Sequence, residues 1–214
     1  MRDAKRPAWR FSVPRIPLWI VYVAGLLPAV WTFYLGFTDQ LGADPLRTLE
    51  RTLGEWALRF LIAALLVTPL RQIVGLNLLR YRRQFGLLGF YYALLHLSTY
   101  LILDQGLDMA AIIADVLKRP YITIGMAAFA LLVPLAVTSN NASVRKLGAR
   151  AWGRLHRLAY VATALGALHF LMVVKAWPIE PIVYVAIVAA LLGWRSWRAW
   201  ASSGPSRRLA PETR

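Results

Sequence analysis

Six long apolar segments dominate this chain of 214 residues. A helix needs about 20 mostly apolar residues to cross the hydrocarbon core of a bilayer. The segments that approach this length are residues 16–37, 53–70, 85–103, 121–138, 155–174 and 182–200. The sequence therefore predicts an all-α fold, a polytopic membrane bundle of six transmembrane helices over residues 16–200. A basic N-terminal segment, 1–15, and a tail, 201–214, flank the bundle.

The composition supports a membrane protein and excludes several cofactor classes. Apolar residues make up 58% of the chain and charged residues only 16%, whereas about a quarter of a soluble domain is charged. The chain has no cysteine. That absence excludes a disulfide framework, thiolate-bound iron–sulfur clusters, zinc ribbons and a covalently attached c-type heme.

The charges divide unequally between the two sides of a six-span topology. The side that carries both termini has 19 basic and two acidic residues, and the other side has six basic and eight acidic residues. The positive-inside rule therefore predicts that both termini are cytoplasmic. Attraction of these basic bands to anionic lipid accounts for the net charge of +15, so we expect no nucleic-acid partner. Arg195 and Arg198, near the end of the last segment, are expected to snorkel to the membrane interface.

Three histidines are the main candidates for chemistry inside the bilayer, where ionisable residues usually have a function. At ~1.5 Å rise per residue, His96 lies about 17 Å beyond Phe85, and His169 lies about 21 Å beyond Leu155. The two segments run in the same direction, so both imidazoles reach a similar depth. Two neutral imidazoles on facing helices can hold a b-type heme iron from both sides. The alternative is that each histidine forms an interhelical hydrogen bond, worth around 1 kcal/mol.

His156 lies 13 residues before His169 and close to the predicted cytoplasmic surface. The separation of roughly 20 Å suits a second heme across the membrane, but 13 residues at ~100° each leave the two rings about 140° apart. Three interpretations stay open. His156 is an axial ligand with an unidentified partner, the ligand of a five-coordinate heme, or an interface histidine hydrogen-bonded near Arg154 and Arg157.

The third segment offers no matching second histidine. Counting 13 or 14 residues back from His96 reaches Arg83 or Arg82, and a guanidinium has no lone pair to give to iron. These two arginines, with Arg150 and Arg154, can instead pair with heme propionates or with a flavin phosphate. Positive-inside topology explains them equally well. Small residues near His96, among them Gly89, are consistent either with a groove for a flat macrocycle or with close helix packing.

Four stretches carry a resemblance to a known family. They are RRQFGLLGFYYALLHLSTY at 82–100, RPYITIGM at 119–126, PLAVTSN at 134–140 and RKLGARAWGRLHRLAYVATALGALHFLMVVK at 145–175. In their order and spacing, the chain resembles the MsrQ (formerly YedZ) family. Members are heme-binding membrane subunits of periplasmic methionine sulfoxide reductase systems, and the family belongs with the ferric-reductase-like transmembrane domains. The resemblance runs from about residue 14 to 200.

The resemblance implies cofactors and ligands for this chain. It implies b-type heme, one or two per chain, and FMN. The family's heme histidines map onto His96, His156 and His169. Larger ferric-reductase-like relatives carry two histidines in each of two helices, and this chain has Arg82 and Arg83 where the fourth would stand. That departure leaves the ligation of an inner heme open, and no phosphate-cradling glycine loop places FMN.

The resemblance also implies a place in an electron-transfer chain within the bacterial inner membrane. Electrons would come from the quinone pool or a cytoplasmic flavin reductase. They would pass to a periplasmic molybdopterin-dependent catalytic subunit that reduces methionine sulfoxide in oxidised proteins. The chain has no nicotinamide or flavin domain of its own. We therefore expect a cytochrome b-type electron-transfer subunit rather than the catalytic subunit. The alternatives are a stand-alone transmembrane ferric or metal reductase and a small transporter or scaffold with structural histidines.

Overall fold

A computed structural model describes residues 15–174 and 178–202, and the regular structure within these ranges is entirely helical. The helices are α1 (Leu18–Phe37), α2 (Pro45–Pro69), α3 (Arg82–Ser98), α4 (Met109–Lys118), α5 (Pro120–Val137), α6 (Asn141–Leu155), α7 (Leu158–Val173) and α8 (Ile179–Ser202). One π-helical turn extends α2 through Leu70–Val74, and another extends α3 through Thr99–Asp104. The predicted all-α fold is confirmed.

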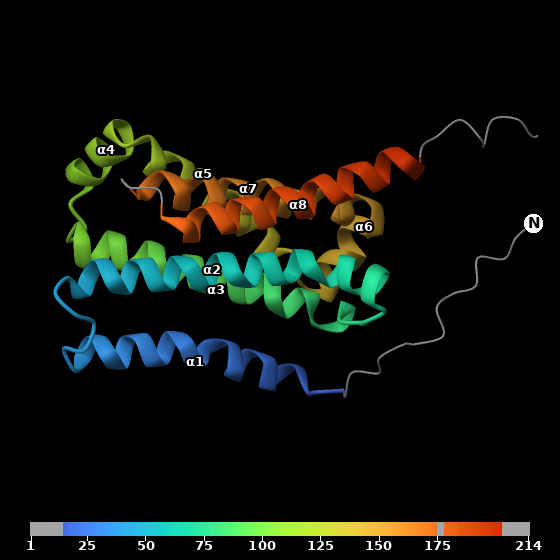
Figure 1. Ribbon diagram of the computed structural model, residues 1–214, viewed down its shortest axis with the longest axis horizontal. Helices are drawn as coiled ribbons and strands as arrows, with labels where there is room; N and C mark the ends of the chain where they lie inside the picture. Colours follow the sequence, from blue (N-terminus) through green and yellow to red (C-terminus); the bar gives the residue numbers. More distant parts are fainter. Residues whose placement is uncertain (1–14, 175–177, 203–214) are drawn as a thin grey trace, which may run out of the picture.

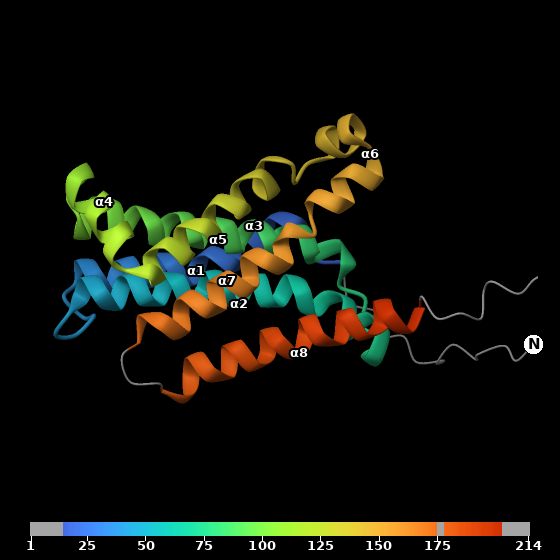
Figure 2. The same ribbon diagram turned by 90° about the horizontal axis from the view of Figure 1, so that it is seen from above.

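Six of these helices run back and forth along the long axis, with α4 at one end and α6 at the other (Figure 1). We call these the α4 end and the α6 end; α1 begins and α8 finishes at the α6 end. Five helices are individually long and apolar enough to cross a membrane, and α6 and α7 pass the same test only as a pair bent by 42°, which gives up to six spans. Figure 2 shows this bend. The chain is therefore a multi-pass membrane protein. The cytoplasmic placement of both termini stays a prediction. Residues 1–14 and 203–214 lie outside the described ranges.

Helix α2 occupies the centre of the bundle because its apolar residues point in three directions. Leu53 packs between α1 and α3, Leu58 and Leu65 pack against α7 and α8, and Leu61 packs against α5 and α7. The closest helix pairs are α2 with α3 and α5 with α7. These two pairs carry the candidate site described below.

The proline inside α1 is accommodated by a side chain from α3. The hydroxyl of the fully buried Tyr92 accepts a hydrogen bond from the backbone N–H of Ala29 at 2.9 Å and donates one to the carbonyl of Gly25 at 2.8 Å. This hydroxyl therefore stands between two backbone groups that a regular helix would join directly, one residue after Pro28. A neighbouring helix thus satisfies the backbone at the proline, as membrane bundles require.

The helices extend beyond the apolar segments that predicted them. Helix α2 begins at Pro45 rather than residue 53, because Asp44 caps its N-terminus by accepting a hydrogen bond from the N–H of Arg47 and Pro45 fits the first turn. Its first three turns contain charged residues, which hydropathy excludes from a span. The short helices α4 and α6 lie in stretches predicted only as loops, because α4, with 10 residues, is too short to register as a span and α6 is too polar.

Candidate functional site

The structure brings His96 of α3 and His169 of α7 together. Their ring centroids are 6.1 Å apart and their planes cross at 71°. Both side chains are half-buried. No group of three or more histidine, cysteine or carboxylate side chains is arranged for a metal ion within the described ranges. Any metal at this site must therefore bring further ligands of its own, as a porphyrin does.

His96 is fixed against the backbone of α2. Its Nδ1 lies 2.9 Å from the carbonyl oxygen of Glu50. The ring also packs onto Gly54, where an added Cβ would lie 3.3 Å from Nδ1. Glycine at this position therefore lets the imidazole lie against the helix surface.

His169 repeats this arrangement on the other helix pair. Its Nδ1 lies 2.7 Å from the carbonyl oxygen of Tyr121 in α5. The ring packs onto Gly125, where an added Cβ would come within 2.9 Å of Nδ1 and of Cε1. In both cases the accepting carbonyl belongs to the residue four positions before the glycine. We call each set of glycine and carbonyl a histidine cradle.

The two cradles fix which ring nitrogen carries the proton. A carbonyl oxygen can only accept, so Nδ1 of each histidine is the N–H donor and Nε2 keeps its lone pair. Within the described ranges, neither Nε2 atom makes a hydrogen bond. Two metal–nitrogen bonds of about 2.0–2.1 Å, with the ring radii added, place two axial imidazole centroids roughly 6 Å apart. The donor atoms and the spacing of His96 and His169 therefore fit a heme iron held between them.

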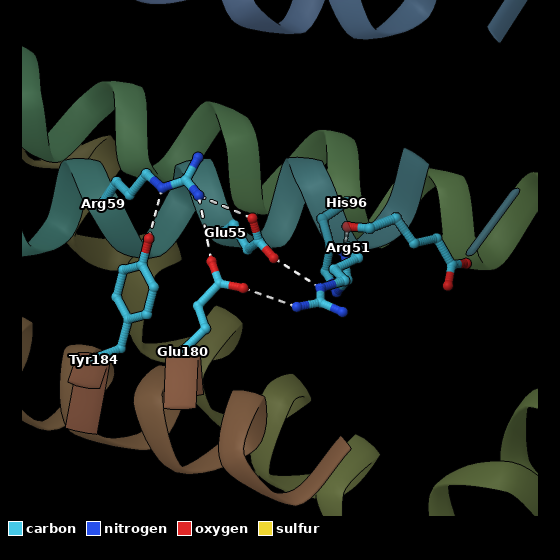
Figure 3. Close-up of polar contacts among 7 residues, drawn as sticks. Arg51, Glu55, Arg59, His96, Glu180 and Tyr184 are labelled. Atoms are coloured by element: carbon cyan, nitrogen blue, oxygen red, sulfur yellow. Dashed lines mark hydrogen bonds and ion pairs between the residues drawn. The ribbon is translucent and has the colours of Figure 1, made fainter. Parts of the chain in front are cut away.

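An ion-pair network lies near His96 and joins α2 to the start of α8 (Figure 3). Arg51 contacts Glu55 at 2.8 Å and Glu180 at 2.9 Å, and Arg59 contacts Glu55 at 2.9 Å. Arg59 also donates a 2.6 Å hydrogen bond to the hydroxyl of Tyr184. Two positive and two negative charges therefore balance in the α4 half of the bundle.

His156 lies in the bend between α6 and α7, away from the other two histidines. Its ring stacks on Trp152 with a centroid distance of 3.8 Å, and its Nε2 lies 3.0 Å from the hydroxyl of Thr138. That hydroxyl donates its own proton to the carbonyl of Pro134 at 2.6 Å, so it accepts from His156. Nε2 of His156 is therefore the N–H donor, the opposite tautomer from the cradled pair.

The four arginines suggested as cofactor partners, Arg82, Arg83, Arg150 and Arg154, lie at the α6 end. Arg82 and Arg83 are in the first turn of α3, and Arg83 donates a 2.9 Å hydrogen bond to the side chain of Asn141. Arg154 is exposed on α6. It contributes to a shallow basic hollow lined by Ala149, Arg150, Gly153, Arg154 and Arg157.

Sequence reasoning missed the residues that hold the histidines. It considered the glycines on the helix of His96, but Gly89 packs against Leu61 of α2 and so serves helix contact. Gly54 and Gly125 form the cradles, from helices that carry no site histidine. The available signal was the single glycine inside each of α2 and α5, at a depth matching that of one histidine.

Comparison with known proteins agrees with this architecture. The family described as ferric reductase like transmembrane component matches residues 53–167. Proteins from Brucella ovis, Brucella canis and Brucella abortus, each named protein-methionine-sulfoxide reductase heme-binding subunit MsrQ, are 64% identical to this chain over 169 residues. The alignment covers 79% of this chain and 76% of each relative. The chain therefore belongs to the MsrQ family of ferric-reductase-like transmembrane proteins.

Proposed function

We propose that this protein is the membrane electron-transfer subunit of a methionine sulfoxide reductase system, with a b-type heme held between His96 and His169. The observation that supports the proposal best is the pair of matching histidine cradles. Each fixes an imidazole with its Nε2 lone pair available, and the ring centroids are 6.1 Å apart. The names of the MsrQ relatives, which describe heme-binding subunits, agree with this reading.

The protein's own contribution is to orient the two ligands and to keep water away. The Nδ1 hydrogen bonds hold each ring in one tautomer and one orientation, as outer-shell partners of metal ligands do. Helices α2 and α5 stand behind the rings, so neither ligand can swing away without losing its backbone partner. A bis-imidazole heme supplies one-electron transfer, with a potential set by ligation and burial.

We propose the following direction for the electrons. The donor, the quinone pool or a cytoplasmic flavin reductase, acts from the α6 end, and a periplasmic molybdopterin-dependent subunit docks at the α4 end in the bacterial inner membrane. Charge supports this orientation. All eight acidic residues within the described ranges lie in the α4 half, and α6 at the opposite end is basic. FMN stays a prediction from family resemblance, supported only by the basic charge of the hollow on α6.

The contacts of His156 support one preformed heme site rather than two. The ring presents an Nε2–H that is bound to Thr138, so ligation through Nε2 would require both loss of that bond and a change of tautomer. A second heme at His156 would therefore need local rearrangement in the bend between α6 and α7. We accordingly propose one heme at the cradled pair as the minimum content.

The decisive experiment is the visible spectrum of the purified protein, produced with ample heme supply and reduced with dithionite. We expect a Soret band and a bis-imidazole low-spin spectrum, with at least one heme per chain. A colourless protein would overturn the proposal. The reduced protein should then be reoxidised by methionine sulfoxide only when the molybdopterin subunit is present. Rapid reoxidation by a ferric chelate alone would instead support a stand-alone metal reductase.

A further inference from the structure

The guanidinium of Arg195 in α8 is half-buried against α2 and α7, whereas a snorkelling side chain would extend away from the bundle. Its Nη2 donates a 2.7 Å hydrogen bond to the carbonyl of Leu65 in α2, and its Nη1 donates a 3.0 Å bond to the hydroxyl of Tyr160 in α7. The guanidinium also lies over the ring of Tyr160, 4.9 Å from its centroid. Arg198, one turn later, is exposed and contacts only the ring of Trp194 among the described residues.

A proline explains why Arg195 turns inward. In a regular helix the carbonyl of Leu65 would accept the N–H of the residue four positions later, but that residue is Pro69, which has no N–H. The guanidinium supplies the missing donor. This contact uses only part of its hydrogen-bonding capacity, because Nε of Arg195 is buried and has no partner among the described residues. A buried, unpartnered donor on a charged group is costly unless something else binds it.

The surroundings of Arg195 contain positive charge without a balancing carboxylate. Arg82, at the start of α3, lies within electrostatic range of both Arg195 and His156. Every ion pair formed within the described ranges lies in the α4 half of the bundle. Ionisable residues inside a membrane protein pair with one another or with backbone carbonyls, and Arg195 has the carbonyl of Leu65 but, among the described residues, no carboxylate.

We propose that Arg195 binds an oxyanionic group in the α6 half of the bundle, where Arg82 adds positive charge. The group is either a propionate of a porphyrin bound within the bundle or the phosphate of an anionic lipid. Guanidinium groups bind carboxylate and phosphate oxygens through the same charge-assisted hydrogen bonds. The porphyrin source rests on the proposed function, whereas the lipid source does not.

The test compares Arg195→Gln, Arg195→Lys and the matched control Arg198→Gln in the full-length protein. The first variant removes the charge, and the second keeps the charge but loses the planar donor array. A purely structural role would affect Arg195→Gln and Arg195→Lys alike. An oxyanion site predicts that Arg195→Lys keeps part of the anion binding that Arg195→Gln abolishes, because the ammonium still attracts the anion. Arg198→Gln should behave as wild type.

Two measurements separate the sources. Heme per chain and midpoint potential are recorded for each variant; a propionate ligand predicts loss of heme or a negative shift of potential in Arg195→Gln. Melting temperature is recorded in nanodiscs of phosphatidylcholine with and without phosphatidylglycerol. A lipid phosphate predicts stabilisation of wild type by phosphatidylglycerol that Arg195→Gln loses, with heme unchanged. If Arg195→Gln and Arg198→Gln have the same heme content, the same midpoint potential and the same stabilisation by phosphatidylglycerol, the inference is overturned. A wild type without heme would overturn the proposed function, while the lipid measurement would still test Arg195.

Discussion

The two ends of the bundle use the same residue types in opposite ways. In the α4 half, His96 and His169 donate through Nδ1 to backbone carbonyls, and the arginines Arg51 and Arg59 pair with carboxylates. In the α6 half, His156 donates through Nε2 to a hydroxyl, and no carboxylate among the described residues pairs with the arginines there.

This difference shows that the role of a histidine or an arginine depends on which of its nitrogen atoms has no hydrogen-bond partner. Two neighbouring imidazoles whose Nε2 lone pairs are unused provide ligands for a metal. A guanidinium with a buried, unpartnered N–H provides a site for an anion. Histidines at the two ends are therefore expected to respond differently to substitution.

The largest effect is expected from the cradled histidines. His169→Ala or His96→Ala removes one of two axial ligands, so we expect loss of the low-spin spectrum and of most bound heme, measured by the pyridine hemochrome assay. His156→Ala is the matched control and should keep the heme of the cradled pair. Retention of the pair's heme in His169→Ala, with loss in His156→Ala, would reverse the assignment.

The cradle glycines should give the next largest effect, graded by the space available. Gly125→Ala places a methyl group 2.9 Å from the His169 ring, whereas Gly54→Ala places one 3.3 Å from that of His96. Overpacking of this kind costs about 1–3 kcal/mol, and we expect lower heme occupancy and lower thermal stability, more so for Gly125→Ala. Gly86→Ala, whose Cβ meets nothing within 4 Å, is the control. Equal behaviour of all three variants would contradict the cradle.

Thr138→Val tests the α6 end more gently. The substitution keeps the shape of the side chain but removes the hydroxyl that accepts from His156. We expect a loss of about 1 kcal/mol in unfolding free energy and an unchanged spectrum for the cradled pair. Ser139→Ala removes a neighbouring hydroxyl that contacts only the Leu135 carbonyl within the described ranges, so it controls for the loss of a backbone contact. A large loss of heme in Thr138→Val would show that His156 and the pair are coupled.

The smallest effect is expected from the charges beside the cradle. Arg51→Gln breaks contacts to Glu55 and Glu180, but about half of the Arg51 side chain is exposed, with a relative accessibility of 48%. Exposed ion pairs contribute roughly 0–1 kcal/mol, so stability should fall by less than for Gly125→Ala and heme content should not change. Arg47→Gln, which removes the same charge and breaks only the largely exposed 3.3 Å pair with Asp44, is the control. If Arg51→Gln lost heme, the network would have to be treated as part of the site.

The sequence predicted the fold well because apolar length is a local property. Hydropathy identified the five helices that qualify as spans and the bent pair that could be a sixth, and the count of residues along each helix placed His96 and His169 at similar depth. The cradles could not be predicted, because Gly54 and Gly125 act on side chains from other helices and only packing shows which faces meet. The inward turn of Arg195 was equally hidden, since it depends on a carbonyl left without a donor by Pro69 in a different helix.

The cradle carbonyls have a consequence for vibrational spectroscopy. In a regular helix the carbonyls of Glu50 and Tyr121 also accept the N–H groups of Gly54 and Gly125, so each oxygen serves the helix and an imidazole together. Withdrawal of an electron from the site makes each imidazole N–H a stronger donor, which weakens the attached C=O bond. Isotope labelling of these two peptide groups should therefore reveal amide I bands that move to lower wavenumber on oxidation. The backbones of α2 and α5 would then report the oxidation state directly.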